Sequence, residues 1–140
     1  MTQPLPVVVF PDAEQVAVTL LRARLPAGTV VGTEWPDALE SRLPSGVVSV
    51  TRGGGAINLT DVAEDVVLDI DVLAATKKTA HDLAQRVRAH LHAVRGSVQA
   101  GARVYGVSDT SLVWLPHHPS AETDPIPRYV LVMSMVIRPA

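Results

Sequence analysis

The chain has 140 residues, a formal net charge of −2, 47% hydrophobic residues and only 19% charged residues. This length predicts one domain over residues 1–140 with a sizeable core, and the near-neutral charge excludes a surface built to bind phosphate. The absence of cysteine excludes disulfides and thiolate catalysis.

The low charge indicates that partners cover part of the surface, because soluble domains carry about 25% charged residues and rarely expose large apolar patches. The alternative is a well-packed monomer rich in alanine and valine. No apolar run approaches the about 20 residues that span a bilayer, and the first ten residues lack the basic start of a signal peptide. We therefore expect assembly in a cytoplasm, with no membrane partner.

The first half of the chain predicts one helix and three strands. Asp12 and the glutamine three residues later match a capping box, and apolar residues at helical spacing follow until a stop at residues 25–28. Residues 29–34, 47–52 and 66–73 have the β-branched content and the period of two that are typical of strands.

The second half predicts a long helix and two more strands. An apolar stripe at steps of three and four begins after Thr76 and ends before Gly96, which suits a helix of about twenty residues. Residues 107–115 and 130–138 follow as strands, separated by a polar loop. The order predicts an α+β domain, with a mostly antiparallel sheet of about four to five strands packed by two helices, one of them long.

The last predicted strand, residues 130–138, has one serine and one arginine among apolar side chains. Such a strand is typical of a position buried on both faces. Either it lies centrally under helices, or another copy of the protein covers one of its faces. Replacing Ile137 with aspartate is then expected to weaken oligomerisation or folding.

Residue patterns for catalysis or metal binding are weak. Gly53–Gly55 follows a strand but precedes a further strand, which fits a hairpin tip or a bulge better than a phosphate-binding loop. Asp69 and Asp71 share a strand face without a third ligand, so a solvated face or the acidic lining of a pore is favoured over a metal site. No histidine pair has the spacing of helical metal ligands, and no serine lies in a nucleophile elbow. We predict no catalytic residue, no cofactor and no metal.

The chain resembles the tail terminator proteins of long-tailed bacteriophages, which include lambda-like terminators and small neck proteins of actinobacterial phages. The resemblance covers nearly the whole chain through an ordered set of short motifs. These are Pro11–Glu14, Leu43–Gly54, Asp65–Val72, Thr79–Val94 and Pro127–Arg138.

The resemblance implies a non-enzymatic virion protein of the tail or neck, assembled in the host cytoplasm. Its members form a homo-oligomeric ring, usually of six subunits, that caps the tail tube and stops its polymerisation. The implied partners are the major tail tube protein and a head-completion or stopper protein, with genomic DNA crossing the lumen. Asp69 and Asp71 are candidates for the lumen wall, where acidic groups would keep DNA from sticking.

Candidate residues for the partner interface are apolar, aromatic, basic or in the glycine run. The alternatives to a tail terminator are another neck subunit (head-completion, stopper or tail-completion protein), a dimeric small-molecule-binding regulatory domain and, least favoured, a small enzyme. Mobile tips formed by the glycines and by residues 56–60 would suit docking on the tube. The interface candidates are Arg52, Gly53, Gly54, Gly55, Ile57, Trp114, Arg128 and Tyr129.

Overall fold

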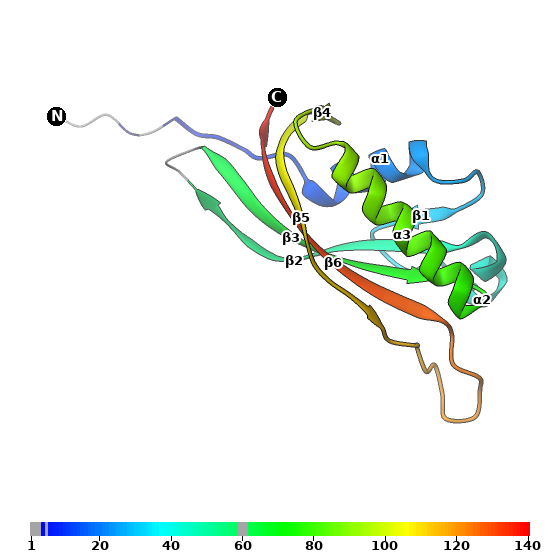
Figure 1. Cartoon of the computed structure of the whole chain (residues 1–140). Coiled ribbons are helices and arrows are strands. Elements are labelled where there is room, and N and C mark those ends of the chain that lie inside the picture. Colours follow the sequence, from blue (N-terminus) through cyan, green and yellow to red (C-terminus); the bar gives the residue numbers. More distant parts are fainter. Residues whose placement is uncertain (1–3, 5, 59–61) are drawn as a thin grey trace.

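The computed structural model describes residue 4, residues 6–58 and residues 62–140. Within these residues the chain forms one six-stranded sheet, three α-helices and a 3-10 turn (Figure 1). The elements in chain order are α1 (Ala13–Arg24), β1 (Val30–Gly32), α2 (Leu39–Arg42), the 3-10 turn η1 (Leu43–Ser45), β2 (Val47–Asn58), β3 (Ala63–Leu73), α3 (Lys77–Ala93), β4 (Val98–Gln99), β5 (Ala102–Trp114) and β6 (Arg128–Pro139).

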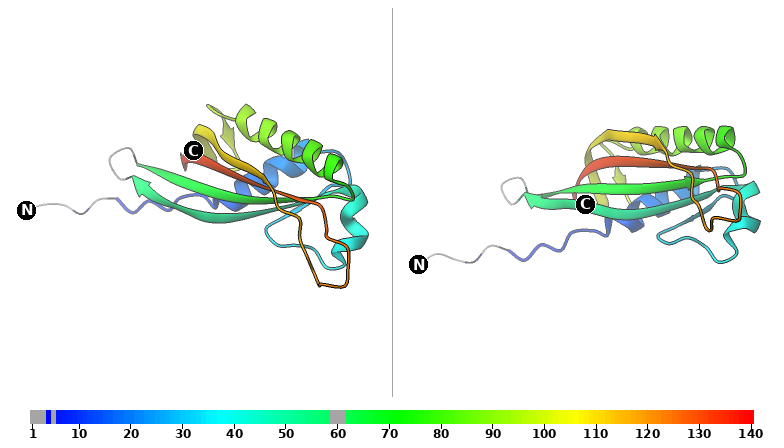
Figure 2. Two further views of the ribbon diagram at one scale, coloured as in Figure 1. Left: turned by 60° about the horizontal axis from the view of Figure 1, so that its bottom comes forward. Right: turned by 90° about the horizontal axis from the view of Figure 1, so that it is seen from below.

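The sheet is mixed and curls like half of a barrel (Figure 2). Its strand order is β1-β2-β3-β6-β5-β4. The short strand β1 runs parallel to β2, and every other neighbouring pair is antiparallel. The last strand of the chain, β6, therefore lies in the middle of the sheet, between β3 and β5.

The predicted architecture is wrong in its strand number, its sheet type and its helices. The sheet has six strands and is mixed, and the three helices have 12, 4 and 17 residues, so none reaches the expected twenty. Glycines misled the prediction, because β2 continues through Gly53–Gly55 to Asn58 and the glycine-rich segment 97–106 contains β4 and the start of β5. Part of the predicted loop, residues 59–61, lies outside the described residues.

Both longer helices begin at a side-chain cap. The carboxylate of Asp12 accepts hydrogen bonds from the backbone N–H groups of Glu14 and Gln15, at 3.0 and 3.3 Å. At α3, Thr76 and Thr79 form a reciprocal capping box. These caps accept from backbone N–H groups that the first helical turn cannot pair internally, so the helices begin at these residues. The two helix starts predicted from sequence are confirmed.

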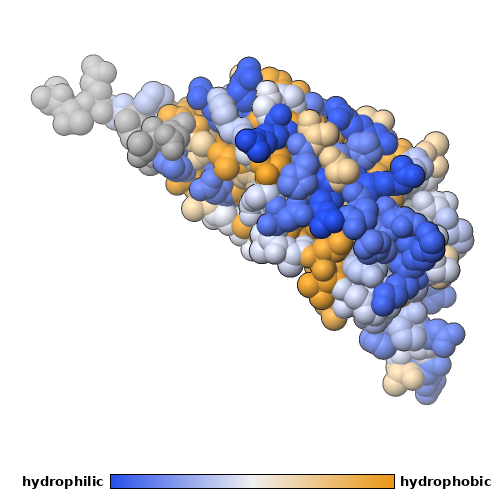
Figure 3. Space-filling view, viewed as in Figure 1, coloured by the Kyte–Doolittle hydropathy of each residue, from blue (hydrophilic) through white to orange (hydrophobic). Residues whose placement is uncertain are grey.

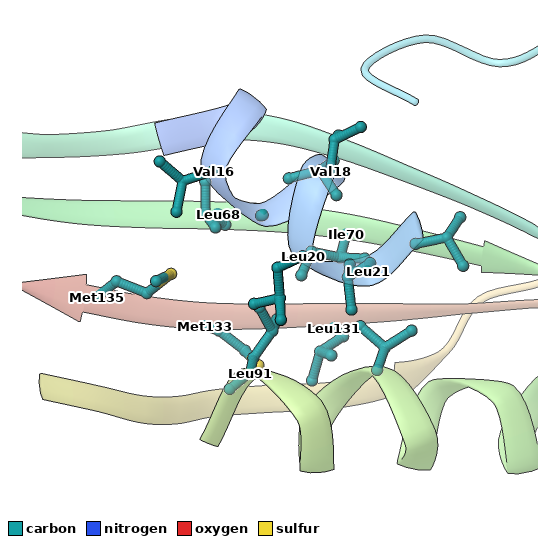
Figure 4. Packing of buried hydrophobic residues seen from close by; sticks show 14 of the residues in the cluster. Val16, Val18, Leu20, Leu21, Leu68, Ile70, Leu91, Leu131, Met133 and Met135 are labelled. Carbon is teal, nitrogen blue, oxygen red and sulfur yellow. The ribbon is translucent and has the colours of Figure 1, made fainter. Parts of the chain in front are cut away.

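Helices α1 and α3 pack on one face of the sheet and form the main core with it (Figure 4). We call this the inner face. Alternate residues of β3 and β6 point into it, because successive side chains of a strand lie on opposite sides. Fully or nearly fully buried side chains in this core include Leu21, Leu68, Ile70, Leu91, Leu131, Met133, Met135 and Ile137.

The described residues cover the other face of the sheet, here called the outer face, mainly at one end. There Val47, Leu73 and Ile126 form a second small cluster, against which Trp35 and residues of the α2–η1 segment pack. The main core does not extend through the sheet to the rest of this face. No helix in the described part of the chain is both long and apolar enough to cross a membrane.

Candidate assembly surfaces

The predicted interface residues form two groups at opposite ends of the sheet. Arg52, Gly53–Gly55 and Ile57 lie in the β2–β3 hairpin, which projects beyond the body of the molecule (Figures 1 and 2). Trp114 and Tyr129 are direct partners in the β5–β6 register at the other end, next to Arg128. The eleven residues of β3 separate the two ends by about 35 Å at 3.3 Å per residue.

Arg52 fastens the base of the hairpin rather than presenting a free charge. Its guanidinium lies 2.9 Å from the carboxylate of Glu64, whose residue is 7% exposed, and also donates to the backbone oxygen of Gly54 at 3.1 Å. The backbone N–H of Arg52 donates to the carboxylate of Glu14 on α1 at 2.7 Å. Neither glutamate was a predicted interface residue; Glu14 entered only through the Pro11–Glu14 motif of the resemblance.

The hairpin geometry requires a glycine at Gly55, whereas at Gly53 an added Cβ would meet only the end of the flexible, exposed Asp69 side chain. A bulge lies between Arg52 and Gly54, and a Cβ on Gly53 would come within 2.2 Å of the Asp69 carboxylate. Gly55 has φ +118°, and a Cβ there would lie 2.0 Å from the backbone oxygen of Asp65. Nothing lies within 4 Å of the corresponding position on Gly54. The glycine run is thus a bulged strand, which confirms the predicted bulge, and not a hairpin tip.

This geometry predicts different effects for two neighbouring substitutions. We expect Gly55→Ala to lower the free energy of unfolding by about 1–3 kcal/mol, because it strains the backbone and collides with Asp65. The matched variant Gly54→Ala should change it by less than about 0.5 kcal/mol. Urea denaturation of both variants is the measurement, and equal effects would contradict the assigned backbone geometry.

At the far end of the sheet, an aromatic group lies on the inner face beside the start of α3. The Trp114 and Tyr129 rings lie 5.2 Å apart, and His81 packs edge-on against Tyr129 at the same distance. The ammonium of Lys77 lies 4.7 Å from the centre of the Trp114 ring. These contacts anchor the two strands to α3, and Trp114 keeps part of its ring accessible.

A second group occupies the outer face at the same end. Trp35 donates its indole N–H to the Asp71 carboxylate at 3.0 Å and packs edge-on against His117. The guanidinium of Arg128 lies 3.9 Å from the other oxygen of Asp71 and donates to the backbone oxygen of Leu115. Arg128 and Asp71 therefore brace the loops that cover this end.

The two predicted acids share the outer face of β3 but differ in their surroundings. Asp71 is held by Trp35 and Arg128, whereas Asp69 is exposed and lies over Gly53. Of the two carboxylates, Asp69 is the one that is exposed to solvent. Its role at a lumen stays a prediction.

An apolar surface lies on the outer face; the sequence had raised a second apolar face of residues 130–138 as one alternative, without naming its residues. Its side chains alternate along β6 with the core residues, so they point away from the helices, and each is partly exposed. The alternation in residues 130–138 was the available signal, but the apolar residues at every position concealed it. We call this surface the valine face; it consists of Val67, Val113, Val130, Val132 and Val136.

Further apolar side chains are exposed beside the hairpin and along the end of β5, where Figure 3 shows apolar patches on an otherwise mostly hydrophilic surface. Val8 and Ile57 are 38% and 51% exposed near the hairpin, and Leu115 is 50% exposed after β5. Within the described residues, no group of three acidic or histidine side chains could hold a metal ion. The surfaces are suited to contact with other proteins.

Comparison with known proteins agrees with these features. The model of a family described as phage tail termination protein matches residues 9–106. A chain in a solved structure titled as the virion of a native gene transfer agent particle has a similar fold, with a TM-score of 0.60 and 19% sequence identity; the match covers 90% of this chain and 94% of that one. No curated protein matches the sequence. The chain therefore belongs to the phage tail termination protein family and is a structural protein of the virion tail or neck.

Proposed function

We propose that the protein forms a hexameric ring that caps the finished tail tube and stops polymerisation of the major tail tube protein. The ring then joins the tail to a head-completion or stopper protein of the neck, and genomic DNA crosses its lumen without sequence-specific contacts. The family match supports this proposal, and the valine face is the observation that carries it.

The valine face supports a ring because a closed ring needs heterologous contacts, in which one face of a subunit meets a different face of the next. Val132 is half-buried and Val113 is exposed, on a sheet face that no helix of the described residues covers. Burying apolar surface contributes about 25 cal/mol per Å², so covering this face stabilises the assembly. Asp69, the direct neighbour of Val132 on β3, would lie at the margin of this contact, on the side of the lumen.

The two ends of the sheet support a position between two partners. The hairpin with Ile57 projects at one end, and the group around Trp114 and Arg128 lies at the other. A subunit that bridges a tube and a neck needs separate contacts at its two ends. Aromatic and arginine side chains such as these are the residue types that most often dominate binding energy at protein interfaces.

Tail length is the property that tests this proposal. We expect phage lysates without the protein to contain tails of uneven, extended length that carry no head, and expect normal tails when wild-type protein is supplied. Electron microscopy of the lysates measures both properties. Tails of normal length that fail to join heads would contradict capping and would favour another neck subunit.

A further inference from the structure

The β2–β3 hairpin has a free edge. Strand β1 pairs only with the beginning of β2, up to Ser49, and the N–H of Arg52 is taken by Glu14. Beyond that point lie Gly54–Ile57, which we call the hairpin edge. Its residues are exposed and pair with β3 on one side. Apart from the bond from Arg52 to the oxygen of Gly54, the backbone of these four residues has no partner on the other side among the described residues.

The hairpin edge lacks two of the features that protect an edge strand, charge and proline, and has a bulge only at its start. It contains no charged residue and no proline, and its pairing with β3 is regular after the bulge at Gly53. The opposite edge of the sheet, on β5, is interrupted by two bulges, near Tyr105 and near Thr110. Natural sheets use charges, prolines and bulges to prevent edge pairing. Among the described residues, the hairpin edge is therefore better suited to a further strand than the edge on β5.

The same chain contains a segment suited to that position. Residues 6–10, here called the arm, are uncharged and include three consecutive valines before Phe10. Val7 and Val9 are 93% and 81% exposed, whereas Val8 is 38% exposed, so their side chains alternate as in an extended strand. No backbone group of residues 6–10 bonds to another segment of the described chain.

Within one subunit the arm stays apart from the hairpin edge. An open groove of about 490 Å³ separates them, lined by Val8, Val9 and Phe10 on one side and by Ile57 and Glu64 on the other. The arm runs outward in the direction of the hairpin without joining the sheet (Figures 1 and 2). Both the strand-forming segment and the unprotected edge thus remain unpaired in the monomer.

We infer that the arm of one subunit adds as a β-strand to the hairpin edge of the next copy in the ring. Backbone hydrogen bonds would supply the affinity, and the apolar arm side chains would cover Ile57. The contact is heterologous, because it joins an arm to a different surface, as ring closure requires. This inference rests on the proposed ring.

Cysteine cross-linking tests the inference directly, because the chain contains no cysteine. Single-cysteine variants Val7→Cys, Val8→Cys and Val9→Cys are each mixed with a size-tagged Ala56→Cys variant under mild oxidation. Side chains of a paired strand alternate between faces, so we expect a mixed disulfide dimer at position 8 alone or at positions 7 and 9 together. The matched control replaces the Ala56→Cys partner with Ala89→Cys, on the exposed side of α3.

A lysine on the edge provides an independent test. We expect Ala56→Lys to reduce the cross-linking of Ile57→Cys to the arm by about tenfold, because edge lysines oppose strand addition. Ala89→Lys should leave that cross-linking unchanged. Equal cross-linking with all arm positions, or with the control site, would overturn the inference.

Light scattering and electron microscopy of the same samples separate this inference from the proposed function. Rings that form and cap tubes without the expected disulfides would overturn arm addition and leave the proposed function standing. A double variant, Val8→Cys with Ala56→Cys, that closes only within one chain would also overturn it. If no ring forms with or without tail tubes, both are wrong.

Discussion

Ile137→Asp is expected to unfold the protein under native conditions. Ile137 is fully buried on the inner face of β6, in the main core. The substitution removes a large apolar side chain, which alone costs about 2–5 kcal/mol when truncated to alanine, and places a carboxylate where water cannot reach it. The register sets it directly opposite Glu64, which is itself nearly buried, so like charges would also face one another.

Truncation and the buried carboxylate together are expected to cost more than about 5 kcal/mol, which reaches the 5–15 kcal/mol that stabilises a typical domain. Circular dichroism during thermal unfolding is the measurement, with Ile137→Val as the control that should cost about 0.5–1.5 kcal/mol. The sequence left open whether the aspartate would weaken folding or oligomerisation. Because Ile137 is fully buried within its own subunit, we expect the loss in folding stability. A folded, soluble Ile137→Asp protein would contradict the assigned core.

Val132→Lys is expected to leave the fold intact and to prevent ring formation. Val132 lies on the valine face, five positions before Ile137 and on the opposite side of β6. Asp69 and Ser111 are its direct neighbours on the two adjacent strands, so a lysine there gains an acidic partner and the monomer loses less than about 1 kcal/mol. In the ring the same ammonium would be buried against apolar surface.

Leaving a charge in such a contact costs about 1–3 kcal/mol, which weakens association by roughly 5- to 150-fold per contact. Light scattering over a range of concentrations, with and without tail tubes, measures the loss. Val98→Lys, on the edge strand β4 and 45% exposed, is the matched control and should assemble normally. Normal rings from Val132→Lys would show that the valine face is not a subunit contact.

Sequence analysis predicted the helix starts and the cores of the strands well, because these depend on local patterns. Asp12 and Thr76 cap α1 and α3, and β3 shows the predicted alternation around Asp69 and Asp71. It failed where pairing overrode local preference. Gly53–Gly55 favour an interruption by propensity, yet the bulge and the positive φ of Gly55 let β2 continue along β3.

The residues of the candidate surfaces were predicted only in part, because tertiary contacts decide which charged side chains are free. Arg52, Arg128 and Asp71 were selected for their charge, but in the structure each binds a neighbour within the same chain. The residues of the valine face were not predicted individually because every residue from 130 to 138 except Ser134 and Arg138 is apolar. Hydropathy therefore could not separate the two sides of β6.

The sequence by itself determined a cysteine-free domain that is poor in charge, with capped helices, β-branched strands and the motif order of a tail terminator. Only the tertiary structure decided that β6 lies in the centre of a mixed sheet, that its odd-numbered residues from 131 to 137 are core and that its valines are left uncovered. The physical reason is the separation along the chain of the residues that interact. Caps and periodicity are set by residues a few positions apart, whereas the two sides of a strand become different only when distant segments pack on one of them.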